Sequence, residues 1–389
     1  MKLAIVGVGQ AGGKILDQLI EYDTTRNTGF VEHAVAVNSA RTDLAGLTYV
    51  PEADRLLVGQ SIVSGHGAGT DPETGKRCVG EDIHEIDDAV GGVATSGIDA
   101  FLLIAGLGGG TGSGGGPVIA DHLGEIYAEP VYGLGILPST DEGGIYNRNA
   151  ANSLQRFARS TDSLLLFDNG AAKSSGETLS EGYREINDEI ATRFGNLFSA
   201  GEIDAMGGDV AESVVDSSEI INTLGDGGIT SIGYATEAIE TDEGGLLDRF
   251  LGSDDDDLAS SGDATNRITS LVRRATLGKL TLPCEPDSAA RALLIVSGPP
   301  EHLSRKGIDS ARDWLETETD CREVRAGDYP LPDEGRVAAL VVLSGVTEVP
   351  RIEEMQQLAV ESDTGPEDDE QDEKDFESLL EYGDDDGSE

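Results

Sequence analysis

A run of glycines interrupted by two hydroxyl side chains is the segment whose residue types point most directly to chemistry. Residues 106–117 read GLGGGTGSGGGP, after the apolar stretch Ala100–Ala105 and before the helix-like stretch Pro117–Tyr127. Glycines between a strand and a helix let backbone N–H groups gather around an anion, and the helix dipole adds a positive field there. The order of elements predicts a phosphate-binding loop rather than a flexible linker, with Pro117 at the first helical position.

The charge of a bound phosphate would have to be balanced here without basic side chains. No lysine or arginine lies between Phe101 and Tyr127, and the Gly-Lys-Ser/Thr of a Walker loop is missing. Backbone N–H groups, the hydroxyls of Thr111 and Ser113, and Mg²⁺ are left for this purpose. The sequence therefore predicts a phosphate site that uses a divalent cation.

A second glycine segment follows the first predicted strand. Residues 7–13 read GVGQAGG, which fits the GxGxxG pattern of a dinucleotide site and equally a tight turn before a helix. A dinucleotide site needs an acidic residue after the second strand to hold a ribose hydroxyl, but residues 37–40 read VNSA. The missing acidic residue argues against NAD.

Polar side chains on a later helix have the composition of a base-binding surface. Tyr183 and Asn187 share one helix face because they are four residues apart. An aromatic ring can stack on a purine, and an amide can pair with the guanine edge. Tyr183 also fits the apolar stripe of its helix, so it could equally be a core residue. The polar residue Asn187 on the same face favours the base-binding interpretation.

The pair Asp216 and Glu219 also has two interpretations. Their spacing of three residues is typical of a capping box, in which the aspartate caps a helix and the glutamate completes the exchange. Spacing alone favours this cap.

The remaining sequence supplies the elements that would position these residues. Residues 1–170 alternate strand and helix patterns, which predicts a mostly parallel sheet covered on both faces, with ligands beyond the carboxyl ends of the strands. Strands are expected at Lys2–Val8, His33–Val37, Arg55–Val58, Ala100–Ala105, Val131–Leu137 and Ser163–Phe167, and helices at Ala11–Glu21, Glu81–Val90, Pro117–Tyr127 and Gly144–Arg159.

A longer amphipathic helix over 177–199 leads into a second α/β region. Its expected strands are Ile229–Ala235, Ala292–Val296 and Val337–Leu343, its expected helix is Asn266–Leu277, and Ser253–Asp263 is expected to be a solvated loop. From Glu361 onward the sequence is nearly continuous acid and predicts a disordered tail.

Composition limits the classes of partner. The 389 residues carry a net charge of −47, which indicates a folded protein adapted to molar salt and disfavours nucleic acid and anionic membranes. Three scattered cysteines predict reduced thiols and a cytoplasmic location without a metal cluster. No apolar stretch approaches the roughly 20 residues of a membrane span.

The segment GGGTGSG, residues 108–114, resembles the nucleotide-loop signature of the tubulin/FtsZ superfamily. The chain looks most like the CetZ group, the tubulin-like cytoskeletal proteins of halophilic archaea, and the resemblance covers most of residues 1–350. It implies GTP or GDP as ligand with Mg²⁺, a ribose contact from Glu142 and a γ-phosphate contact from the 59–79 loop. The implied nucleotide-binding residues are Gln10, Ala11, Gly12, Asn38, Ala40, Gly69, Gly108, Gly109, Gly110, Thr111, Gly112, Ser113, Gly114, Pro138, Glu142, Asn169, Tyr183 and Asn187.

The resemblance reverses the preference for a simple cap at Asp216 and Glu219. It places them in a catalytic loop that projects into the nucleotide of the next subunit, where two carboxylates can orient the water that attacks the γ-phosphorus. Contacts of this head-to-tail kind do not close and make filaments. Three positions depart from the bacterial pattern: Val214 replaces an asparagine, Glu219 replaces an aspartate, and Tyr146 stands where an arginine is usual.

The expected architecture is a Rossmann-like GTP-binding domain over 1–176, a connecting helix over 177–200, a smaller C-terminal α/β domain over 201–350 and a largely disordered acidic tail over 351–389. The expected function is that of a cytoskeletal GTPase for cell shape or motility. It would polymerise with itself and use the tail to bind an adaptor. A GTP-binding regulator with little hydrolysis, and a Rossmann oxidoreductase, are the alternatives.

Overall fold

The computed structural model describes most of the chain, and every structural statement below concerns the described residues: 1–91, 97–172, 179–202, 215–225, 227–239, 255–332 and 334–362. Their strands are β1 (Leu3–Val8), β2 (Val31–Asn38), β3 (Arg55–Leu57), β4 (Ala100–Gly106), β5 (Val131–Leu137), β6 (Ser163–Asp168), β7 (Ile229–Ala238), β8 (Arg291–Gly298), β9 (Glu323–Pro330) and β10 (Arg336–Ser344).

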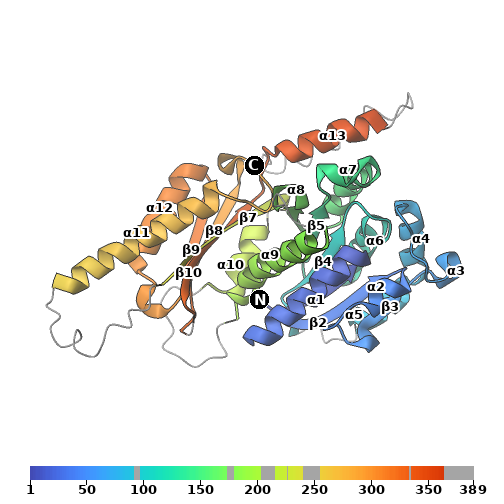
Figure 1. The fold of residues 1–389 in the computed structure, drawn as a ribbon, viewed down its shortest axis with the longest axis horizontal. Coiled ribbons are helices and arrows are strands. Elements are labelled where there is room, and N and C mark those ends of the chain that lie inside the picture. Colours follow the sequence, from blue (N-terminus) through green and yellow to red (C-terminus); the bar gives the residue numbers. More distant parts are fainter. Residues whose placement is uncertain are drawn as a thin grey trace, which may run out of the picture.

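The helices cover both faces of these strands (Figure 1). In the N-terminal half they are α1 (Gly9–Arg26), α2 (Arg41–Ala45), α3 (Gln60–Val63), α4 (Pro72–Glu81), α5 (Ile83–Gly91), α6 (Thr111–Ile126), α7 (Gly144–Arg159) and α8 (Asn169–Ala172). After them come α9 (Leu179–Ser199), α10 (Ser217–Leu224), α11 (Asp255–Leu277), α12 (Arg305–Thr319) and α13 (Pro350–Ser362).

One sheet of ten strands runs through the molecule in the order β3-β2-β1-β4-β5-β6-β7-β10-β8-β9. The pairs from β3 to β7 are parallel, β10 pairs antiparallel with both β7 and β8, and β8 and β9 are parallel. The expected α/β class, with a parallel N-terminal half and a C-terminal α/β half, is confirmed.

Two apolar clusters, one on each face, hold the helices to the sheet. On one face Leu16 of α1, Phe194 of α9 and Leu224 of α10 pack with inward side chains of the strands. On the other face α6, α7, α11 and α12 pack in the same way, through residues such as Ile119 and Leu271. Because each cluster extends over both halves of the sheet, burial of apolar surface joins the halves as well as stabilising each of them.

The halves meet at β6 and β7 through a short backbone contact. Only the pairs Leu164–Ile229 and Leu165–Thr230 form the register there. Buried hydroxyl groups cross the same place: Thr230 Oγ1 lies 3.2 Å from Ser163 Oγ and donates to Ser344 Oγ at 3.1 Å. We call this contact the seam of the sheet.

Several expected element boundaries are wrong. Pro117 lies inside α6 rather than at its first position, because the preceding glycines are themselves helical. The first turn of α6 can form here because glycine lets it pack closely against α4. A Cβ on Gly114 would overlap the carbonyl oxygen of Pro72 at the start of α4. Helices α4 and α12 and strand β9 were not predicted from the sequence. The solvated loop expected at 253–263 is helical from Asp255 onward.

The C-terminal boundary also differs from expectation. Residues 351–362, assigned to the acidic tail, belong to α13, whose side chains Ile352 and Met355 are fully buried. The helix forms because this apolar pair packs into the core beside α7. No helix in the described part of the chain is long and apolar enough to cross a membrane.

Candidate functional site

The parallel strands bring the predicted binding segments to one edge of the sheet. The carboxyl ends of β1, β4, β5 and β6 are followed by the segments 9–12, 107–111, 138–143 and 169–172, and the end of β2 carries Asn38. Because neighbouring strands are parallel, these ends lie side by side. This carboxyl edge is where α/β sheets bind ligands.

Some of the glycines at this edge are required by packing. A Cβ on Gly12 would overlap the carbonyl oxygen of Ile104 in β4, so α1 can approach the strand only with glycine at that position. On Gly112 a Cβ would lie 2.7 Å from the carbonyl oxygen of Gly106, and on Gly110 2.7 Å from that of Gly69. These contacts bring the helix N-termini close to the strand ends.

Two other glycines face open space instead. A Cβ on Gly109 or on Gly69 would meet no atom within 4 Å, and Gly69 has the positive φ of +61° that favours glycine. The neighbouring Gly108 lies beside Tyr146 and Pro138. The backbone at these two positions is therefore open to a ligand.

Hydroxyl and amide side chains hold the loops around this space. Ser39 Oγ lies 2.7 Å from Thr111 Oγ1 and accepts the backbone N–H of Ala68 at 2.9 Å. Asn149 of α7 donates to the carbonyl oxygens of Thr70 at 2.7 Å and Gly108 at 3.1 Å. The loop that carries Gly69 is thereby fixed against the glycine run.

The two hydroxyls expected to face the phosphate are engaged within the loops. Thr111 is paired with Ser39, and the Ser113 hydroxyl donates to the carbonyl oxygens of Gly109 and Gly110. In this arrangement both side chains position the backbone. The N–H groups at the start of α6 are then the main donors for an anion.

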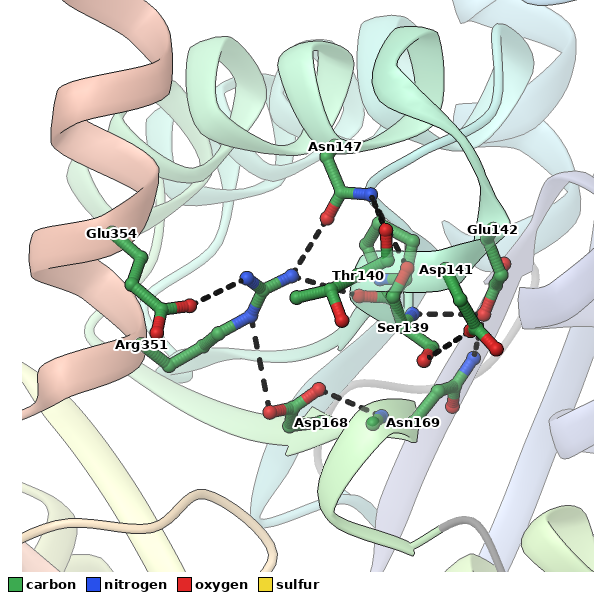
Figure 2. A network of polar contacts seen from close by, with 11 residues as sticks. Ser139, Thr140, Asp141, Glu142, Asn147, Asp168, Asn169, Arg351 and Glu354 are labelled. Carbon is green, nitrogen blue, oxygen red and sulfur yellow. Dashed lines mark hydrogen bonds and ion pairs between the residues drawn. The ribbon is translucent and has the colours of Figure 1, made fainter.

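Three residues predicted to contact the nucleoside lie together at the same edge. Glu142 Oε1 accepts the backbone N–H of Ser139 at 2.9 Å and the amide of Asn169 at 3.3 Å (Figure 2). Partial burial, followed by the charge and hydrogen bond of Glu142, raises the pKa of Tyr183 to about 12. The tyrosine is 41% exposed, which corrects the alternative that it is a core residue.

One polar atom in this group has no hydrogen-bond partner within the described part of the chain. Asn169 is a buried residue, and its Oδ1 accepts no hydrogen bond from the described residues. A buried acceptor without a donor is costly, so a ligand with N–H groups would be favoured there. The amide and imide N–H groups of a guanine edge are donors of this kind.

The other predicted binding residues lie close by with simpler surroundings. Gln10 and Ala11 form the first turn of α1, where Gln10 is exposed. Asn38 donates to Asp43 at 3.2 Å and accepts the N–H of Ala40 at 3.0 Å, which fixes the turn after β2. Asn187 is half-buried on α9, one turn beyond Tyr183.

Asp216 and Glu219 lie at the opposite edge of the sheet. A Cβ on Gly201 would lie 2.7 Å from the nitrogen of Met1 and 3.1 Å from that of Ser217, so the start of α10 is beside the amino end of β1. The glycine loop follows the other end of that strand. The structure therefore separates these carboxylates from the nucleotide-binding segments of the same chain.

The helix cap predicted from spacing is present at this amino edge, where Asp216 accepts the backbone N–H of Glu219 at 3.0 Å. The structure records no return hydrogen bond from the Asp216 N–H to the Glu219 side chain among the described residues, so the full capping box is not formed. The hydrogen bond from Ser218 is the main reason that the pKa of Asp216 is below its usual value. Burial, followed by the charge of Asp216, raises the pKa of Glu219.

Sequence reasoning missed a polar network behind the carboxyl edge (Figure 2). Arg351 of α13 is buried and donates to the carbonyl oxygen of Pro138 at 3.0 Å and to Asn147 Oδ1 at 2.7 Å. Its Nε lies 3.9 Å from Asp168 Oδ2. The polar pair Asn147 and Asn149 on a buried helix face was a signal for this network, but no local pattern connects Arg351 with residues two hundred positions earlier.

The fold and the site define a nucleotide-binding α/β protein with glycine-rich loops at the carboxyl edge of a parallel sheet. Residues 2–176 match the Tubulin/FtsZ family, GTPase domain, and residues 176–361 match the Tubulin-like CetZ, C-terminal domain. The chain belongs to the tubulin/FtsZ family and, within it, to the CetZ group.

Relatives and solved structures agree with this assignment. Tubulin-like protein CetZ1 of Haloferax volcanii is 57% identical over 366 residues, which are 93% of this chain and 92% of that protein. The GDP-bound monomer structure of CetZ1 from the same organism is 53% identical, with a TM-score of 0.83 over 93% of this chain and 99% of the other. A GTPγS-bound protofilament structure of its CetZ2 is 42% identical, with a TM-score of 0.81 over 93% and 98% of the two chains.

Proposed function

We propose that this chain binds GTP with Mg²⁺, polymerises head-to-tail with itself, and hydrolyses GTP at the contact between subunits. The separation of the two edges carries the proposal. The nucleotide-binding segments and the pair Asp216 and Glu219 are on opposite edges of one sheet, too far apart to act on one nucleotide within a subunit. Stacking two subunits edge to edge would bring them together.

In this proposal the carboxyl edge binds the nucleotide through uncharged groups. Backbone N–H groups around Gly108–Gly114 receive the phosphates, Gly69 borders the γ-phosphate, Glu142 accepts the ribose hydroxyls, and Asn169, Tyr183 and Asn187 contact the base. The unpartnered Oδ1 of Asn169 and the open space at Gly109 support this assignment. Gln10, Ala11, Gly12, Asn38, Ala40 and Pro138 complete the lining.

Mg²⁺ would be held mainly by the nucleotide. Among the described residues no group of three or more histidine, cysteine, aspartate or glutamate side chains is arranged to hold a metal ion. Mg²⁺ commonly binds phosphate oxygens and keeps several waters, so few protein ligands are needed. When bound, it would neutralise charge on the phosphates.

Asp216 and Glu219 of the next subunit would orient the attacking water. An ionised Asp216 accepts hydrogen bonds, and a Glu219 with a raised pKa is better suited to take up a proton than an ordinary glutamate. The CetZ2 protofilament bound to GTPγS supports the polymer part of the proposal by homology. We further propose a cytoplasmic, cytoskeletal role in cell shape or motility, with the acidic tail as an adaptor site. We also propose domains over 1–176, 177–200 and 201–350, with the tail beginning after α13.

The test is GTP turnover per subunit against protein concentration, measured in molar KCl with Mg²⁺. A shared site requires turnover to rise steeply above a threshold concentration, in parallel with sedimentable polymer. Turnover per subunit that stays constant with concentration would mean a site complete in one chain and would contradict the proposal.

A GTP-binding regulator with little hydrolysis is the second candidate. The observation in its favour is the helix cap that Asp216 forms on α10, which accounts for Asp216 without any catalytic role. Tight GTP binding without turnover at any concentration would favour it.

A further inference from the structure

Helix α13 returns from the C-terminal half of the molecule to the nucleotide-binding half. It follows β10 and lies along α7, as Figure 1 shows in red above green. Its side chains Ile352 and Met355 are buried in the same apolar cluster as Leu154 of α7. The helix is therefore fixed behind the carboxyl edge of the sheet, on the segment that leads into the acidic end of the sequence.

The first turn of α13 places one guanidinium among groups from three elements (Figure 2). Arg351 has 6% of its side chain exposed, and it donates hydrogen bonds to Pro138 after β5 and Asn147 on α7. Its Nε forms an ion pair at 3.9 Å with Asp168 at the end of β6, without a hydrogen bond to any described residue. Its remaining amino group donates to Glu354 at 3.0 Å. A planar fork of donors can satisfy several acceptors at once, which an ammonium group cannot.

Asn147 connects Arg351 to the 138–143 loop, which carries the predicted ribose-binding residue Glu142. Its amide donates to the carbonyl oxygens of Ser139 at 3.2 Å, Thr140 at 3.4 Å and Gly143 at 3.2 Å. Arg351 occupies the other end of the same amide, so the orientation of Asn147 depends on the guanidinium. These hydrogen bonds restrain the backbone of the loop that carries Glu142.

Asp168 connects Arg351 to the turn after β6, which carries the predicted base-binding residue Asn169. Its Oδ1 accepts the backbone N–H of Gly170 at 2.8 Å, which fixes the turn that presents Asn169. Burial raises the pKa of this aspartate, while Arg351 opposes that rise by favouring the charged form. The guanidinium thus supports both loops that line the nucleoside pocket without reaching the pocket itself.

We propose that Arg351 is a positioning residue for nucleotide binding: by clamping the loops after β5 and β6, α13 sets the affinity of the pocket for the nucleoside. The proposal rests on the proposed GTP site. It makes the affinity for nucleotide depend on a helix that belongs to the C-terminal half. We expect Arg351 to have no effect on the phosphate contacts or on the residues of the amino edge.

The test measures binding of a fluorescent GDP analogue to the full chain with Arg351→Lys, in molar KCl. The lysine keeps the positive charge near Asp168 but loses the fork, so we expect affinity to fall about tenfold, or about 1.4 kcal/mol. Turnover at saturating GTP should equal that of the parent, so that KM changes without kcat. Glu353→Gln, on an exposed position of the same helix, is the matched control and should bind like the parent.

A second variant keeps the proposal testable if Arg351→Lys folds poorly. Asn147→Ala should weaken binding in the same direction, and the loss in the double variant should be smaller than the sum of the two single losses, because both substitutions loosen the same 138–143 loop. Unchanged affinity in folded Arg351→Lys and Asn147→Ala would overturn the positioning role. Failure of the parent itself to bind GDP would overturn the proposed function, and the positioning role with it.

Discussion

The two edges of the sheet are built by different means. The carboxyl edge uses backbone: glycines bring N–H groups to the strand ends, and neutral side chains such as Ser39 and Asn149 fix the loops. The amino edge presents two carboxylates on one short helix, α10. Backbone N–H groups can bind an anion without any basic residue. A pair of carboxylates cannot bind the phosphates itself and can act only on a nucleotide that another edge binds. If GTP is hydrolysed at a shared site as proposed, this difference explains why each subunit would supply only half of that site.

The largest effect is expected where a glycine is required by packing. Gly12→Ala would place a methyl group on the carbonyl oxygen of Ile104, and overpacking of this kind costs about 3 kcal/mol. The matched variant Gly109→Ala adds the same methyl group in open space, so it should melt like the parent but bind GDP more weakly. Thermal melting and GDP titration of the two variants would distinguish them. Equal melting temperatures for both would mean that packing does not explain Gly12.

A somewhat smaller effect is expected at the amino edge. Glu219→Gln should reduce GTP turnover about 100-fold, the lower range for a lost acid–base group, without changing GDP affinity. Asp216→Ser keeps a good helix cap and should also reduce turnover, whereas Asp216→Ala should in addition lose about 1 kcal/mol of stability. Turnover per subunit and melting temperature are the measurements. If only stability responds, the pair is a cap and the regulator is the better description.

The smallest effect is a difference in pH dependence between the edges. The lowered pKa of Asp216 means that its carboxylate stabilises the fold above about pH 4, and that this stabilisation is lost as the pH falls through the folded pKa. Asp168 has a raised pKa, so ionisation costs stability and the parent gains stability as the pH falls toward about 4. Melting of the parent relative to Asp216→Asn and Asp168→Asn should therefore change in opposite directions on acidification. Parallel changes would mean that one of these two environments is misassigned.

Much of the carboxyl edge could be predicted because its signals are local. The glycine run, the apolar strands and the spacing of Tyr183 and Asn187 each lie within one short stretch of sequence. Helix starts were less predictable, since Pro117 normally marks a first turn and only packing against α4 extends α6 to Thr111. The contacts of Arg351 with Pro138 and Asp168 depend on tertiary structure alone, so no periodicity or motif predicts them.

The seam between β6 and β7 has a mechanical consequence. Two backbone pairs and a row of hydroxyls are a narrow attachment between two broad pieces of sheet. The backbone part of this attachment is short, so the angle between the N-terminal and C-terminal halves depends largely on the two apolar clusters that extend across it. In the proposed head-to-tail polymer small changes of this angle would add from subunit to subunit, so the curvature of a structure many subunits long would depend on the packing across the seam.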